Sequence, residues 1–154
     1  MRFRLLIVGL LGAVVAVSVA PGVGQVSAQS DAIQMRQGIL GGFGKAVKEP
    51  GSMLRQEAPF DLATVRASLR TIAEGAPKLK AQFPDDSKTG AYTEALPVIW
   101  EKKETFLQIF DQLAASATAA GAAIKDEATF RAEWGKVSAN CRACHKVYRS
   151  LPKN

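Results

Sequence analysis

The chain has 154 residues, with 20 Lys and Arg against 14 Asp and Glu, 47% hydrophobic residues and 7% aromatic residues. This length and composition suit one globular domain and exclude a disordered chain. The presence of only two Cys and one His excludes a disulfide-rich scaffold and a zinc site built from several Cys and His side chains.

The first 28 residues have the pattern of a secretory signal peptide. Two arginines precede an apolar run over residues 5–20, Pro21-Gly22 ends the run, and Val26-Ser27-Ala28 offers the small residues that a signal peptidase accepts. A membrane anchor is the alternative, because the run approaches the length of a short transmembrane helix. We expect cleavage after Ala28, export to the periplasm, and a single domain over residues 29–154.

Removing this segment leaves 18 basic against 14 acidic residues, a net charge of +4. Many of the remaining bases alternate with acids, as in Glu101-Lys102-Lys103-Glu104. Such alternation is typical of a solvated helix face. We therefore expect no nucleic-acid partner.

The first half of the exported domain predicts two amphipathic helices. Residues 31–48 form the first, because its stripe recurs at three- and four-residue spacing. Asp61 is placed to cap the second, and the turn-rich residues 83–90 follow as the longest loop. The two stripes are Ile33, Arg36, Gln37, Leu40, Phe43 and Val47, then Leu62, Val65, Leu69, Ile72 and Ala76.

The second half predicts two more helices, one from Pro97, which suits a first helical turn, and one from Asp126. Their stripes are Ile99, Phe106, Phe110, Leu113 and Ala117, then Phe130, Trp134, Val137, Cys141, Cys144, Tyr148 and Leu151. No stretch alternates with period two for long enough to predict a strand. Four amphipathic helices with short connections predict an all-α, antiparallel four-helix bundle.

Three glycines, Gly41, Gly42 and Gly44, fall inside the first predicted helix. A glycine costs about 1 kcal/mol relative to alanine in a helix interior. Two interpretations remain open: the helix bends or ends early, or a bulky group such as a cofactor or a partner helix approaches its backbone there.

The chemistry of the sequence is concentrated in Cys141-Arg142-Ala143-Cys144-His145. C-x-x-C-H is the motif that attaches haem covalently. On a helix these two thiols and the imidazole project toward one side, so two thioether bonds and one proximal iron ligand are available. A thioredoxin-like redox pair would need a βα context, and a zinc site would need further Cys or His ligands; the sequence predicts neither.

With this motif on the last of four helices, the chain resembles the class II c-type cytochromes, the cytochrome c′ family. Further matches are Met35-Arg36-Gln37, Ala58-Pro59-Phe60-Asp61, Phe83-Pro84, Ile99-Trp100 and Tyr148-Arg149. The resemblance covers nearly all of the mature chain. It implies one haem c held by Cys141 and Cys144.

The resemblance also assigns residues around the haem. It implies that Arg36 and Gln37 lie near the haem edge and propionates, that Arg149 lies beside the proximal face, and that Glu94 lies at the haem edge. A solvated surface arginine is the alternative for Arg36, but its place on the apolar stripe argues against it.

The sixth iron position decides the function. Low-spin relatives have a methionine where this sequence has Leu40, and a leucine offers iron no donor atom. Met35 points about 140° away from Leu40 on a helix, and Met53 lies off the stripe. We expect five-coordinate, high-spin iron with His145 as its axial ligand and Leu40 over the distal face.

An apolar, crowded distal pocket favours small neutral diatomic molecules, and the resemblance implies binding of nitric oxide and carbon monoxide. Electron transfer with an unidentified periplasmic redox partner is compatible, and a low-spin cytochrome acting purely in electron transfer is the alternative. We expect no enzyme activity, because peroxide cleavage needs a distal acid–base group and the only His is proximal. The resemblance also implies a homodimer.

Overall fold

The computed structural model describes residues 23–150, and their side chains from Asp31 onward. Most of the predicted signal peptide therefore lies outside the described residues. The helices are α1 (Val23–Ala46), α2 (Lys48–Leu54), α3 (Leu62–Leu79), η1 (Lys80–Gln82), η2 (Asp85–Lys88), α4 (Val98–Glu101), α5 (Lys103–Ala123) and α6 (Glu127–Tyr148).

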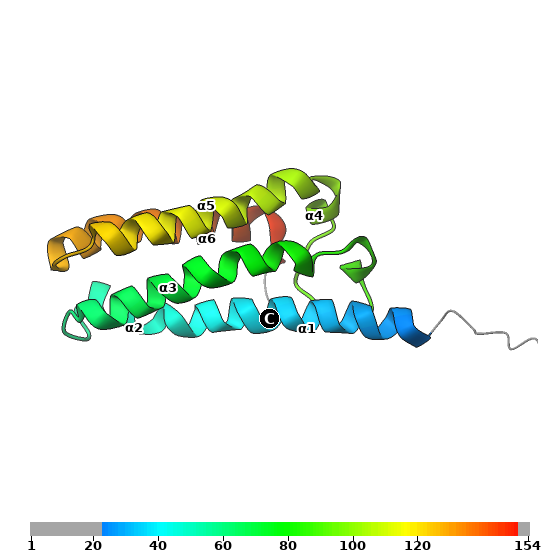
Figure 1. Cartoon of the computed structure of the whole chain (residues 1–154), viewed down its shortest axis with the longest axis horizontal. Coiled ribbons are helices and arrows are strands. Elements are labelled where there is room, and N and C mark those ends of the chain that lie inside the picture. Colours follow the sequence, from blue (N-terminus) through cyan, green and yellow to red (C-terminus); the bar gives the residue numbers. More distant parts are fainter. Residues whose placement is uncertain (1–22, 151–154) are drawn as a thin grey trace, which may run out of the picture.

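The four long helices form the predicted bundle. α1 packs mainly against α3, α3 against α5, and α5 against α6, and α1 runs antiparallel to α6 (Figure 1). The described residues contain no strand, only an isolated antiparallel bridge between Ala95 and Arg149. The prediction of an all-α four-helix bundle is confirmed.

Side-chain caps account for where α3 and α6 begin, and the sequence predicted the first of them, Asp61. The carboxylate of Asp61 accepts hydrogen bonds from the backbone N–H groups of Ala63 and Thr64. Asp126 and Thr129 form a reciprocal capping box at the start of α6. Both carboxylates satisfy N–H groups that have no partner within the helix.

Two helix boundaries differ from the sequence prediction. α1 begins at Val23, eight residues before the predicted start, because nothing after Pro21-Gly22 interrupts helical backbone. The predicted third helix is divided at Lys102, whose φ of −122° and ψ of 39° separate α4 from α5. α4 is held to the preceding connection, since the indole of Trp100 donates to the carbonyl of Pro84 over 3.0 Å.

The junction of α1 and α2 shows how a proline is accommodated. Pro50 has no N–H to donate to the carbonyl of Ala46, four residues earlier. The buried hydroxyl of Ser68, on α3, donates to that carbonyl over 2.7 Å. Ser68 thereby replaces the missing bond and ties α3 to this junction.

Apolar side chains from α2, α3, α4, α5, α6 and the connections form one buried core. Most of the predicted stripe residues belong to it. The core consists of Met53, Val65, Leu69, Ile72, Ala76, Leu79, Phe83, Ile99, Phe106, Phe110, Leu113, Ala117, Ala120, Ile124, Phe130, Trp134, Val137 and Tyr148.

The glycines of α1 do not mark an early end, because α1 continues through them to Ala46. Apart from chain neighbours and the nearby backbone of α1 itself, no described atom lies within 4 Å of where a Cβ would stand at Gly41, Gly42 or Gly44. The close helix–helix approach is instead at Gly75 of α3, where a Cβ would lie 2.5 Å from Cε1 of Phe43. Gly75 therefore sets how closely α1 packs on α3.

Candidate haem site

The three residues of the haem motif project from one side of the last turns of α6. His145 is rotated about 40° from Cys141, and Cys144 about 60° on the other side. Cys141 and Cys144 are free thiols, each half-buried against the core. His145 is exposed. The two thiols and the imidazole therefore lie on the same side of α6.

Burial governs the protonation of these groups. It raises the pKa of the Cys144 thiol to about 11, and it also raises the pKa of Cys141. Both sulfurs are therefore neutral thiols at pH 7. Partial desolvation by neighbouring atoms lowers the pKa of His145, although its side chain is exposed, and the positive charge of Arg149 lowers it further. A neutral imidazole is the form that can bind iron.

The 92–96 segment, Tyr92 to Leu96, holds the C-terminal end of α6. Arg149 Nε donates to Glu94 Oε2 over 2.6 Å. Backbone N–H groups also donate across the junction, from Leu96 to Tyr148 and from Ser150 to Glu94. Glu94 and Arg149, both predicted to lie beside the haem, are thus brought together one turn beyond His145.

The same segment is bound to α1. Gln37 Nε2 donates to the carbonyl of Tyr92 over 2.9 Å, and Arg36 Nη2 donates to Thr93 Oγ1 over 3.0 Å. The 92–96 segment therefore connects the middle of α1 to the end of α6.

Arg36 is buried, with 2% of its surface exposed. Besides Thr93, its guanidinium donates to the carbonyl of Gln82 and to the hydroxyl and carbonyl of Ser87. The guanidinium also lies over the ring of Phe83, 4.9 Å from the centroid. These contacts exclude the alternative of a solvated surface arginine.

Leu40 lies one turn beyond Arg36 on α1, and His145 lies one turn before Arg149 on α6. Because α1 and α6 are antiparallel (Figure 1), the step from Arg36 to Leu40 and the step from Arg149 to His145 lead away from the 92–96 segment in the same direction. We infer that Leu40 and His145 lie at a similar height in the bundle. Leu40 is 39% exposed, which is unusual for a leucine on the stripe of a bundle helix.

Residues 31–149 match the family model described as cytochrome C′. A cytochrome c′ of Rhodopseudomonas palustris is 49% identical over 138 residues, which is 90% of this chain and 94% of the relative. The chain belongs to the cytochrome c′ family. It is accordingly a c-type haem protein, and the predicted covalent haem c is confirmed at the level of the family.

Solved structures of the family share the fold. Cytochrome c′ from Rhodopseudomonas palustris aligns with a TM-score of 0.78 at 49% identity, covering 80% of this chain and 98% of that chain. A nitric oxide complex of a mutant cytochrome c prime from Alcaligenes xylosoxidans aligns with a TM-score of 0.69 at 25% identity, covering 80% and 97%.

The residues present fit a haem of this family. The donor set is two unpaired thiols and a neutral imidazole within five residues of α6, which is the set that the covalent group requires. Residues 23–150 hold no cluster of three or more His, Cys, Asp and Glu that could bind a bare metal ion. His145 is therefore a candidate ligand for an iron that a porphyrin already holds.

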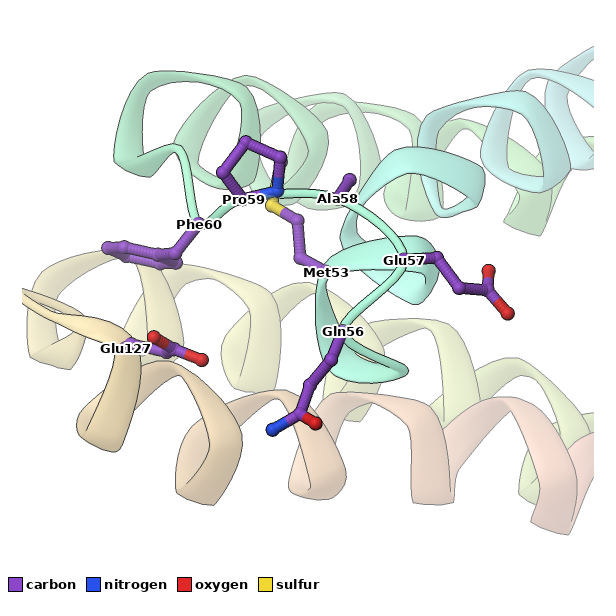
Figure 2. Close-up of a pocket in the computed structure, with 7 residues that line it drawn as sticks. All are labelled: Met53, Gln56, Glu57, Ala58, Pro59, Phe60 and Glu127. Carbon is purple, nitrogen blue, oxygen red and sulfur yellow. The ribbon is translucent and has the colours of Figure 1, made fainter.

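One surface pocket in the described part of the chain lies away from this site. It measures about 290 Å³ and lies between the α2–α3 connection and the first turn of α6 (Figure 2). Glu127, on its wall, is 18 residues from His145, or about 27 Å along α6. Its lining residues are Met53, Gln56, Glu57, Ala58, Pro59, Phe60 and Glu127.

Several residues around the site were not predicted from the sequence. Ser87 and Thr93 bind Arg36, and the carbonyl of Tyr92 binds Gln37. They lie in a connection without periodicity, so no pattern in the sequence marks them. Gly75 did carry a signal, because an isolated glycine in a helical stripe often marks a close packing contact.

Proposed function

We propose that this member of the cytochrome c′ family binds nitric oxide and carbon monoxide at a five-coordinate, high-spin haem iron, with His145 as the proximal ligand. The observation that carries the proposal is that Leu40, one turn from Arg36 on α1 as His145 is one turn from Arg149, has no donor atom for iron.

The other methionine and histidine side chains in the described residues are poorly placed to bind the iron as its sixth ligand. Met35 is 56% exposed and, five residues before Leu40, points to another side of α1. Met53 is buried at the α2–α3 connection, where it lines the 290 Å³ cavity. His145 is the only histidine in the sequence. These positions support an iron without a second protein ligand.

When bound, the haem supplies an iron that coordinates diatomic ligands, and this chain's residues determine which ones reach it. The apolar Leu40 offers no hydrogen bond to an anion or a bound water, so it favours small neutral ligands. The nitric oxide complex of the Alcaligenes xylosoxidans protein is consistent with such a role. We propose no enzyme activity, because neither Leu40 nor a second His can act as a distal acid or base.

Export and assembly complete the proposal. We propose that residues 1–28 direct the chain to the periplasm and are removed there, and that the mature protein forms a homodimer. No helix among residues 23–150 is long and apolar enough to cross a membrane. N-terminal sequencing of the protein from a periplasmic fraction tests the cleavage after Ala28, and sedimentation tests the dimer.

The optical spectrum of the haem-loaded protein tests the iron site. We expect high-spin ferric and ferrous spectra that change on addition of carbon monoxide and of nitric oxide. A low-spin, six-coordinate spectrum that neither gas alters would contradict the proposal and would support a role purely in electron transfer.

A further inference from the structure

Acidic residues are absent from two stretches of the sequence, one around Leu40 and one around His145. Residues 32–48 contain Arg36, Lys45 and Lys48, and residues 134–150 contain Lys136, Arg142, Lys146 and Arg149, with no Asp or Glu in either stretch. These stretches are the parts of α1 and α6 that carry Leu40 and His145. All 14 acidic residues lie elsewhere.

The basic residues of α6 form a stripe beside the proximal ligand. Arg142 and Lys146, four residues apart, lie on one edge of α6 next to His145, and Arg149 follows directly after the last residue of α6. α5 covers the opposite edge, because Asn140, about 200° around the helix from Arg142, donates to Ser116 of α5. The acids at the start of α5 therefore do not face the stripe.

The charges of this stripe remain largely uncompensated. Glu94 is the acid that the 92–96 segment brings to it, and its carboxylate pairs with Arg149. Arg142 and Lys146 are exposed and form no ion pair with residues 31–150. Tyr92, 78% exposed, stands beside Glu94 at the end of the stripe.

We propose that Arg142, Lys146 and Tyr92 form a docking surface for an electron-transfer protein whose own surface is acidic. The inference rests on the proposed function, since it concerns the electrons that this haem protein exchanges. Opposite charges steer two proteins into a productive encounter, and Tyr and Arg are enriched where proteins bind one another. The surface flanks His145, so a docked partner lies close to the iron ligand.

The exchange moves one electron between the reduced protein and the oxidised partner, and no bond forms or breaks. The rates at which an anionic and a cationic small redox reagent react with the protein report on the electrostatic field at this surface. Hexacyanoferrate(III) carries negative charge, whereas tris(1,10-phenanthroline)cobalt(III) carries positive charge. Each can oxidise the ferrous, haem-loaded protein in a stopped-flow experiment.

The variant Lys146→Gln tests the surface, and Lys125→Gln is its matched control. Both remove one positive charge, but Lys125 precedes α6 and lies 21 residues from Lys146, or about 30 Å along the helix axis. At 10 mM salt, where the Debye length is about 30 Å, we expect Lys146→Gln to slow oxidation by hexacyanoferrate(III) about threefold and to accelerate oxidation by the cobalt complex. Lys125→Gln should change both rates much less. Equal effects of the two variants would overturn the proposal.

A second measurement identifies the class of partner. Poly-L-glutamate, as an acidic polypeptide, should perturb the NMR signals of Tyr92 and residues 142–149, and Lys146→Gln should weaken its binding. Preferential binding of phosphatidylglycerol vesicles, with no perturbation by poly-L-glutamate, would assign the surface to a membrane and overturn the proposal. Neither variant should alter the optical spectrum or carbon monoxide binding, so failure of the docking surface is distinguishable from failure of the gas site.

Discussion

Arg149 Nε lies 2.6 Å from Glu94 Oε2, and this pair joins the helix of the haem motif to the segment that Arg36 and Gln37 hold on α1. Three residues of the connection, Tyr92, Thr93 and Glu94, thus fix the position of α1 relative to the end of α6. These two helices are the two sides of the proposed site. A change in that segment should therefore affect both sides.

Arg36→Met tests how strongly the connection depends on the buried guanidinium. The substitution removes the hydrogen bonds that Arg36 donates to the hydroxyls of Ser87 and Thr93 and to two carbonyls, so we expect a loss of about 3 kcal/mol in the free energy of unfolding. Arg36→Lys should recover little, because one ammonium cannot reproduce the planar fork. Gln37→Ala, which removes one exposed hydrogen bond, should cost about 1 kcal/mol or less. Urea unfolding of the three variants measures this, and equal losses in all three would contradict it.

Gln56→Gly should stabilise the protein. Gln56 has a φ of 62° at the end of α2, where its N–H donates to Met53 and that of Glu57 donates to Ser52. This is the hydrogen-bond pattern of a Schellman motif, whose left-handed residue is usually glycine. We expect a gain of up to about 1 kcal/mol, measured by urea unfolding. Gln56→Ala, which keeps the Cβ, should show no such gain.

The capping box of α6 predicts a pH dependence of stability. The hydrogen bond from the backbone N–H of Thr129 holds the pKa of Asp126 below its usual value. A carboxyl group whose pKa is lowered on folding stabilises the protein above its unfolded pKa, about 3.9, and this contribution disappears as the pH falls through the folded pKa. Asp126→Asn keeps an acceptor that does not titrate. The difference in unfolding free energy between wild type and variant should therefore shrink from pH 6 to pH 3, whereas a constant difference would contradict the assignment.

Substitutions of the cysteines and of the histidine in the haem motif should differ in their effects on haem retention and on the optical spectrum. Haem should stay with the chain through denaturing electrophoresis with in-gel peroxidase staining, and the double variant Cys141→Ala/Cys144→Ala should lose it. His145→Ala should keep both thioethers but lose the native spectrum. A wild-type spectrum in His145→Ala would show that another group binds the iron.

The sequence predicted the features that depend on local chemistry. Asp61 was identified as a cap because a side chain at a helix start acts on the next few residues. Cys141, Cys144 and His145 were identified because their spacing is local to one helix. Contacts between distant segments could not be predicted: the partners of Arg36 lie 46 to 57 residues away. The hydrogen bond from Trp100 to Pro84, which ties α4 to the preceding connection, likewise joins residues 16 positions apart.

The carbon monoxide affinity of Leu40→Ala tests the central claim most directly. If Leu40 stands over the iron, a distal ligand must displace its isobutyl group, and removing that group should tighten binding. Relief of about 1.4 kcal/mol corresponds to tenfold tighter binding. Because Leu40 is 39% exposed, its loss should destabilise the fold by less than the roughly 2 to 5 kcal/mol typical of a fully buried leucine. Leu40→Met should in addition convert part of the iron to a six-coordinate, low-spin form. An unchanged carbon monoxide affinity in Leu40→Ala would show that Leu40 does not cover the iron and would contradict the account.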